Sequence, residues 1–154
     1  MLNDFFNVLL PQGCIGFFIL IQLLFAMCIN PKFYKTARWI SVAGISLAIV
    51  LLSTVQTEPQ YFAMREALMS DSYTLLFHFV ILLCGFLSIL LTKNLIEKSK
   101  QNAFTFQAVI LTAILGAMNV VSANDFLTLF ISMELLSFPL YFMIAMPKGY
   151  YSKE

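Results

Sequence analysis

The chain has 154 residues, of which 60% are hydrophobic and only 11% are charged, and its formal net charge is +1. A soluble domain of this length could not bury so much apolar surface, and the near-zero net charge argues against a nucleic-acid partner. The charged residues cluster between apolar runs, so the composition indicates a membrane protein with several spans.

Five apolar runs follow one another along the chain, and each is long enough to cross a bilayer. They cover residues 9–29, 39–55, 73–91, 104–121 and 126–146. Strands of a membrane barrel would be about half as long and would alternate strictly between apolar and polar residues. We therefore predict an all-α membrane protein with five transmembrane helices, forming one membrane domain over residues 1–154.

Local signals mark the ends of these runs. Pro11 suits the first turn of the first helix, because its missing N–H would have no partner there. Trp39 fits an interfacial anchor at the start of the second run. Residues 56–71 form the longest polar connection. A tight turn at residues 122–125 precedes the fifth run, and Asp125 is placed to cap the helix that follows.

The basic residues predict the orientation of the chain. Eight of the nine lie in segments on one side of the predicted membrane, and Arg65 alone lies on the other. The eight are Lys32, Lys35, Arg38, Lys93, Lys98, Lys100, Lys148 and Lys153. The positive-inside rule then puts the N-terminus outside and the C-terminus inside.

The sequence offers no redox or metal motif of its own. Cys14, Cys28 and Cys84 are scattered through apolar runs without metal-ligand or redox spacing. Phosphate-binding loops and hydrolase motifs are also missing. We expect no cofactor and no metal in this chain.

Glu134 is the one acidic residue deep inside an apolar run. It lies eight residues after Phe126, about 12 Å along a helix, and so near mid-depth in a hydrocarbon core of about 30 Å. A charge at that depth costs at least ~2.5 kcal/mol. A functional carboxylate with a partner or a water route, and a protonated, hydrogen-bonded carboxyl used for packing, are both open readings.

Helical spacing gives Glu134 polar neighbours. Ser137 and Tyr141 share its face, three and seven residues on, together with Phe130 and Phe138. Pro139 has no N–H, so the carbonyl of Leu135 loses its usual partner. This combination predicts a polar seam that faces other helices and holds water or a proton carrier.

His78 lies within the third run, between two phenylalanines. A histidine can relay protons or bind a haem or metal. Haem held by two histidines would need a second one, and the chain has only one. A packed, hydrogen-bonded structural histidine is therefore the favoured interpretation.

The stretch SANDFLTLFISMELLSFPLY, residues 122–141, resembles the corner between the fourth and fifth helices of the antiporter-like subunits of respiratory complex I. Within that family it is most similar to subunit 2, called subunit N in bacteria. Leu9-Leu10-Pro11 also resembles the LLPE start of the family's first helix, with Gln12 in place of the Glu, and residues 71–78 are similar to its third-helix entry. The resemblance covers the whole chain but only the N-terminal third or so of the family's length.

The resemblance implies a role for Glu134, because the family's fifth-helix Glu is a proton-path carboxylate that pairs with a Lys on the seventh helix. This chain stops before the sixth helix, so either a separate chain brings the remaining helices and that Lys, which we expect, or the family member is truncated. Other complex I membrane subunits and lipids are the further expected partners. Quinone, flavin and iron–sulfur clusters are expected elsewhere in the complex.

The resulting hypothesis is the N-terminal part of the proton-translocating subunit 2 of NADH:ubiquinone oxidoreductase, an enzyme only as part of that complex. The alternatives are a structural membrane subunit with a vestigial half-site, or a component of a multisubunit cation/proton antiporter. Because split genes of this type occur in some mitochondrial genomes, the expected location is the mitochondrial inner membrane, with the bacterial plasma membrane as the alternative.

Overall fold

The computed structural model describes residues 2–28, 34–55, 61–63, 66–92 and 103–145. Five helices and one short hairpin occupy this part of the chain. In chain order they are α1 (Leu2–Cys28), α2 (Tyr34–Thr54), β1 (Tyr61–Ala63), β2 (Leu68–Ser70), α3 (Ser72–Leu91), α5 (Ala103–Ser122) and α6 (Phe126–Ala145).

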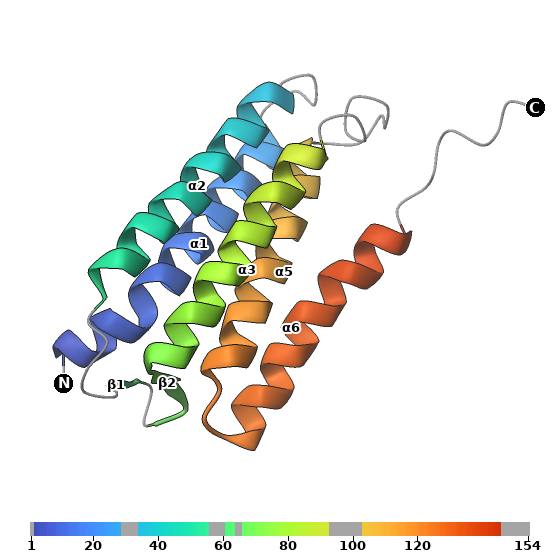
Figure 1. Cartoon of the computed structure of the whole chain (residues 1–154). Coiled ribbons are helices and arrows are strands. Elements are labelled where there is room, and N and C mark those ends of the chain that lie inside the picture. Colours follow the sequence, from blue (N-terminus) through green and yellow to red (C-terminus); the bar gives the residue numbers. More distant parts are fainter. Residues whose placement is uncertain (1, 29–33, 56–60, 64–65, 93–102, 146–154) are drawn as a thin grey trace, which may run out of the picture.

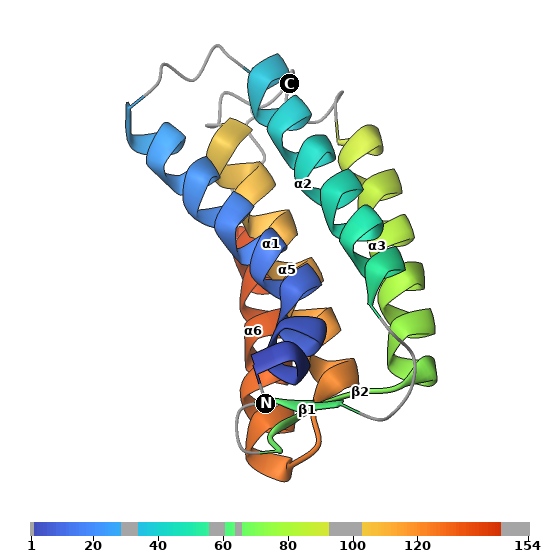
Figure 2. The ribbon, with the colours of Figure 1, turned by 90° about the vertical axis from the view of Figure 1, so that its left-hand side faces the viewer.

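Four of the helices, α1, α2, α3 and α5, form a bundle, and α6 lies against α5 at its side (Figures 1 and 2). α5 contacts all four other helices. Apolar side chains from the four bundle helices meet in one core, among them Ile15, Ile45, Leu82 and Leu111, all fully buried. Burial covers 44% of α5 but only 11% of α6, so α6 is a peripheral helix in this chain.

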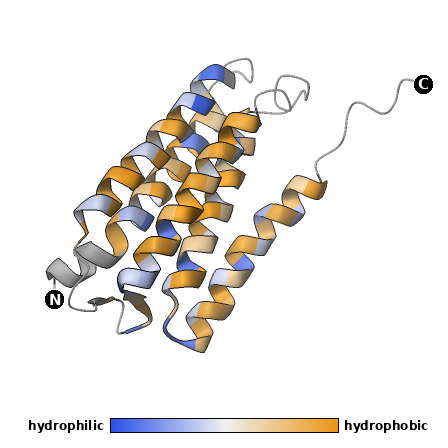
Figure 3. Cartoon of the chain, viewed as in Figure 1, coloured by the Kyte–Doolittle hydropathy of each residue, from blue (hydrophilic) through white to orange (hydrophobic). Residues whose placement is uncertain are grey.

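The prediction of five membrane-spanning helices is confirmed. In the described part of the chain, five helices are long and apolar enough to cross a bilayer, and they are hydrophobic over most of their length (Figure 3). The third, fourth and fifth runs match α3, α5 and α6 to within about one residue, inside the usual uncertainty of helix ends.

The expected positions of Pro11 and of the second helix start were wrong. α1 begins at Leu2, so Pro11 lies inside the helix rather than in its first turn. A proline there leaves the carbonyl four residues earlier without its helical partner. α2 begins at Tyr34, which places Trp39 within the helix, where it is 66% exposed on the outer surface of the bundle.

The polar connection between α2 and α3 contains a hairpin that the sequence did not reveal. β1 and β2 pair antiparallel, with Phe62 opposite Met69. Three residues per strand are too few for a clear alternating pattern. Glu66, in the turn, has a left-handed backbone with φ of 69°.

The hairpin is joined to the corner between α5 and α6. Leu68 forms an isolated bridge with Ala123, and the backbone N–H of Asn124 donates to the carbonyl of Ala67 at 2.9 Å. The Asn124 side chain donates to the carbonyl of Glu66 at 2.8 Å. These contacts place the α2–α3 connection and the α5–α6 corner at one end of the bundle, as the predicted spans require.

The absolute orientation stays a prediction. Much of the basic pattern behind it lies outside the described residues, including Lys32, Arg65, the segment 93–102 and the tail from residue 146. Pro147, which is expected to end the fifth run, also lies there.

Candidate functional site

Two groups of polar side chains lie within the spans, one on the outer face of α6 and one inside the bundle. The α6 stripe, defined as Glu134, Ser137 and Tyr141 with Phe130 and Phe138, faces away from α5. Glu134 is exposed, Tyr141 is 67% exposed and Ser137 is half-buried. No hydrogen bond or ion pair holds Glu134 among the described residues. In this chain taken alone the carboxyl would therefore face the membrane.

The opposite side of α6 packs on α5 through Ser132 and Pro139, which are buried. Gly116 of α5 makes the closest approach. A Cβ added there would lie 2.6 Å from the backbone N of Leu136 and 2.9 Å from the carbonyl carbon of Leu135. Only a glycine allows backbones to come this close, as in other small-residue helix contacts in membranes. Because Leu135 directly follows Glu134, this contact determines the depth and the rotation of the carboxyl.

Asp125 begins α6 in the way predicted from the turn. Its carboxylate accepts a hydrogen bond from the backbone N–H of Thr128, as an N-cap does. That bond and the Thr128 side chain hold the pKa of Asp125 below its usual value. Asp71 caps α3 in the same way, because it accepts from the N–H and the hydroxyl of Thr74, both at 2.8 Å. The backbone bond and then the side-chain bond lower the pKa of Asp71.

Inside the bundle, three helices contribute to a buried group that we call the inner cluster: Gln12, His78 and Ser122. Gln12 Nε2 donates to Ser122 Oγ at 2.9 Å. His78 Nε2 lies 3.0 Å from both Ser122 Oγ and the carbonyl oxygen of Met118. A carbonyl only accepts, so Nε2 carries a hydrogen. Burial away from any acidic group of the described residues disfavours the charged ring, so we assign a neutral imidazole.

The sequence analysis considered His78 alone and did not predict that Gln12 and Ser122 lie beside it. Gln12 entered only as a departure from the family's Glu, although an amide inside an apolar run was a usable signal. Two other glutamines inside the spans are also buried and hydrogen-bonded to a second helix or to the end of one. Gln22 joins α1 to α2 through the carbonyl of Ala37 and the hydroxyl of Ser41, and Gln107 donates to Thr92 at 3.4 Å.

These two groups do not combine into one site, because the α6 stripe points outward while the inner cluster lies between α1, α3 and α5. Within the described residues, no group of three or more His, Cys, Asp or Glu side chains is placed to hold a metal ion.

No family model matches this chain. It is 28% identical over 95% of its length to the chloroplastic NAD(P)H-quinone oxidoreductase subunit 2 of Chlorokybus atmophyticus, and 32% identical over 88% to that of Nephroselmis olivacea. It is 28% identical over 89% to the subunit 2 of Synechococcus elongatus. The chain spans only 26–28% of the length of these relatives.

Among solved structures, the fold matches a chain in the respiratory complex I from Thermus thermophilus with bound aureothin. The TM-score is 0.72 at 21% identity, over 90% of this chain and 30% of the other. This likeness shows a shared helical fold. The curated relatives named here are chloroplastic and cyanobacterial, so the mitochondrial location remains a prediction.

The resemblance seen in the corner motif is thus confirmed: over about nine tenths of its length this chain is similar to NAD(P)H-quinone oxidoreductase subunit 2, of which it matches about a quarter.

Proposed function

We propose that this chain is the N-terminal part of a proton-translocating membrane subunit of the subunit 2 type, within an NADH- or NAD(P)H-driven quinone oxidoreductase. The observation that carries the proposal is Glu134, an exposed carboxyl near the middle of α6, which has the smallest buried share of the five described spans. A carboxyl facing acyl chains is costly, so a protein or water partner outside this chain is required.

The carboxyl would change its proton occupancy with its surroundings. An ammonium brought close to Glu134 favours the ionised carboxylate, and withdrawal of that ammonium into a dry site favours the protonated acid. Alternating between these two arrangements loads and unloads one proton. Ser137 and Tyr141, on the same stripe, would carry the hydrogen bonds that connect the carboxyl to water.

The partners follow from this requirement. We expect a separate chain with membrane-embedded lysines to cover the outer face of α6, together with the other membrane subunits and lipids of the complex. Electron transfer through flavin, iron–sulfur clusters and quinone would take place elsewhere in the complex. The membrane would be the mitochondrial inner membrane or a bacterial plasma membrane.

The decisive variant is Glu134→Gln, which removes the ionisable group while keeping the shape of the side chain. In membrane vesicles containing the assembled complex, we expect fewer protons translocated per NADH oxidised. Glu134→Asp should restore part of the loss. Glu66→Gln is the matched control, because Glu66 lies in the hairpin turn outside the spans. Unchanged proton translocation by the Glu134→Gln complex would exclude the role.

Mass spectrometry of the detergent-solubilised assembly tests the partners. Co-purification with flavin and iron–sulfur subunits and with a chain carrying intramembrane lysines supports the proposal. An assembly without redox subunits would instead identify an antiporter component. If the complex is intact and Glu134→Gln leaves its proton translocation unchanged, the chain is a structural subunit.

A further inference from the structure

The inner cluster contains two buried acceptors that have no donor in the described part of the chain. Gln12 Oε1 and His78 Nδ1 are both buried and have no hydrogen-bond donor among the described residues. Their side chains are only 3% and 2% exposed. A buried polar atom without a partner is costly, and bound water is the usual remedy where the site is polar.

The two acceptors belong to one connected group. Gln12 comes from α1 and His78 from α3, and both reach the hydroxyl of Ser122 at the end of α5. Because Nε2 of His78 donates to the Met118 carbonyl, Nδ1 of the neutral ring can only accept. The missing ligand must therefore donate hydrogen bonds.

The other buried acceptors without a hydrogen-bond donor are not linked to one another through a shared side chain. Gln22 Oε1 and Gln107 Oε1 are also buried without a donor in the described residues. Each is a single atom, whereas the inner cluster joins two acceptors from different helices through a shared hydroxyl. The inner cluster is thus the strongest candidate for an internal ligand.

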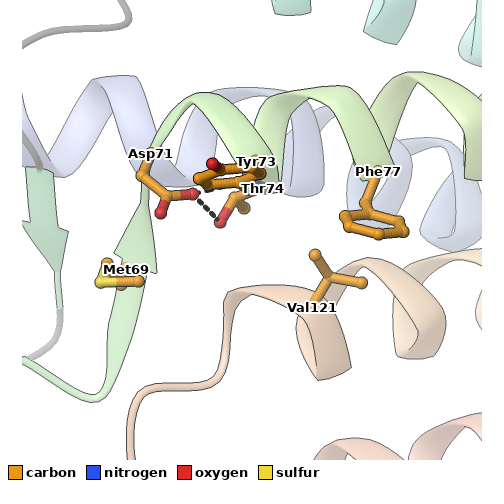
Figure 4. Close-up of a pocket in the computed structure, with 6 residues that line it drawn as sticks. All are labelled: Met69, Asp71, Tyr73, Thr74, Phe77 and Val121. Carbon is orange, nitrogen blue, oxygen red and sulfur yellow. Dashed lines mark hydrogen bonds between the residues drawn. The ribbon is translucent and has the colours of Figure 1, made fainter.

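A pocket of about 310 Å³ lies where β2 and the start of α3 meet the end of α5 (Figure 4). It is lined by Met69, Asp71, Tyr73, Thr74, Phe77 and Val121. Thr74 lies one helical turn before His78, and Val121 directly precedes Ser122. With a volume of about 30 Å³ per water molecule, the pocket has room for several waters near the membrane surface.

We propose that the inner cluster is an internal hydration site, in which water donates hydrogen bonds to Gln12 Oε1 and His78 Nδ1 and exchanges through the Thr74–Val121 pocket. The ligand class is water, because both atoms left without a donor are acceptors and both belong to buried, neutral side chains. This site does not depend on the role of Glu134 and would remain if that role were excluded.

Hydroxyl-radical footprinting of the full chain in its detergent-solubilised assembly tests the proposal. Radicals made by brief X-ray exposure modify side chains beside bound water, and mass spectrometry locates the products. His78 is the only histidine of the chain, so its oxidised peptide is unambiguous. We expect His78 to be oxidised severalfold faster than Phe104, which is fully buried in an apolar cluster.

The variant Gln12→Met removes one acceptor and the donor to Ser122 while keeping a similar length. It should reduce His78 oxidation severalfold. Gln107→Met is the matched control, because it changes an equally buried glutamine at the other end of α5 and should leave His78 oxidation unchanged.

His78 oxidation as slow as that of Phe104 in the unmodified protein would overturn the site. Oxidation that Gln12→Met leaves unchanged would overturn the joint binding of water by the two side chains. If Gln12→Met unfolds the chain, Phe104 oxidation rises as well, and the comparison within the unmodified protein decides.

Discussion

The interior of the four-helix bundle and the outer face of α6 hold their polar side chains in opposite ways. Inside the bundle, Gln12, Ser122 and His78 are buried and hydrogen-bonded across three helices. On α6, Glu134 and Tyr141 are exposed, and Glu134 has no partner among the described residues. The side chains of the bundle core pack against one another, whereas most of the outer face of α6 is uncovered in the described part of the chain.

This difference separates structural polarity from functional polarity. A polar group that the chain itself satisfies stabilises helix association in the membrane, with hydrogen bonds contributing about 0.6–2 kcal/mol each. A polar group that the described residues leave without a partner is costly in a membrane, and our proposal assigns it a role toward a partner. Matched substitutions in the two regions test whether the bundle interior and the outer face of α6 differ in their contribution to stability.

The largest effect is expected from Gly116→Ala. The new methyl group would meet the backbone of Leu136, which cannot move aside as a side chain can. We expect a loss of about 2–3 kcal/mol in the free energy of unfolding, at the upper end of overpacking costs. Thermal or SDS-induced unfolding in detergent, followed by circular dichroism, measures it.

Gly13→Ala is the control for that change. A Cβ at Gly13 meets nothing within 4 Å, so the gain in helix propensity should appear alone. A stabilisation of up to about 1 kcal/mol is expected. Equal effects of the two alanines would contradict a backbone contact at Gly116.

Ser122→Ala and Ser137→Ala make the same chemical change in the two regions. Ser122→Ala removes the acceptor of Gln12 Nε2 and should destabilise the chain by about 1–2 kcal/mol. Ser137→Ala should leave the stability of this chain unchanged, because the half-buried hydroxyl lies on the open α6 face. If Ser137→Ala lowered the free energy of unfolding more than Ser122→Ala does, the Ser137 hydroxyl would already have a hydrogen-bond partner within this chain.

Asp71→Ala removes the cap of α3 and should cost about 1 kcal/mol. The hydrogen bonds from Thr74 lower the pKa of Asp71 in the folded state, so its contribution is fully present above the ordinary carboxyl pKa. It is lost as the pH falls through the lowered pKa. Unfolding curves at acid and neutral pH should therefore differ less for Asp71→Ala than for the unmodified protein.

Asn124→Ala gives the smallest expected effect, about 0.5 kcal/mol, since it removes one exposed side-chain hydrogen bond to Glu66 and keeps the backbone bond to Ala67. Amide hydrogen exchange should increase in the hairpin while α3 and α5 keep their protection. Faster exchange throughout α5 would mean that the corner contact supports the whole bundle.

Much of the fold was predictable because its causes are local. Runs of apolar residues predict the spans, and the Asp125 cap follows from the turn that precedes α6. The hairpin was missed because its strands have three residues each. The early start of α1 was missed because Pro11 was taken as a first-turn residue, although the helix continues through it.

The number of spans and the cap of α6 could be predicted from the sequence, since these depend on run length and on neighbours along one helix. Only the tertiary structure decided which polar side chains meet and which face outward. Helix rotation is set by packing between helices that are distant in sequence, as at the Gly116–Leu136 contact. That packing buries His78 with Gln12 and Ser122 and leaves Glu134 open to a partner.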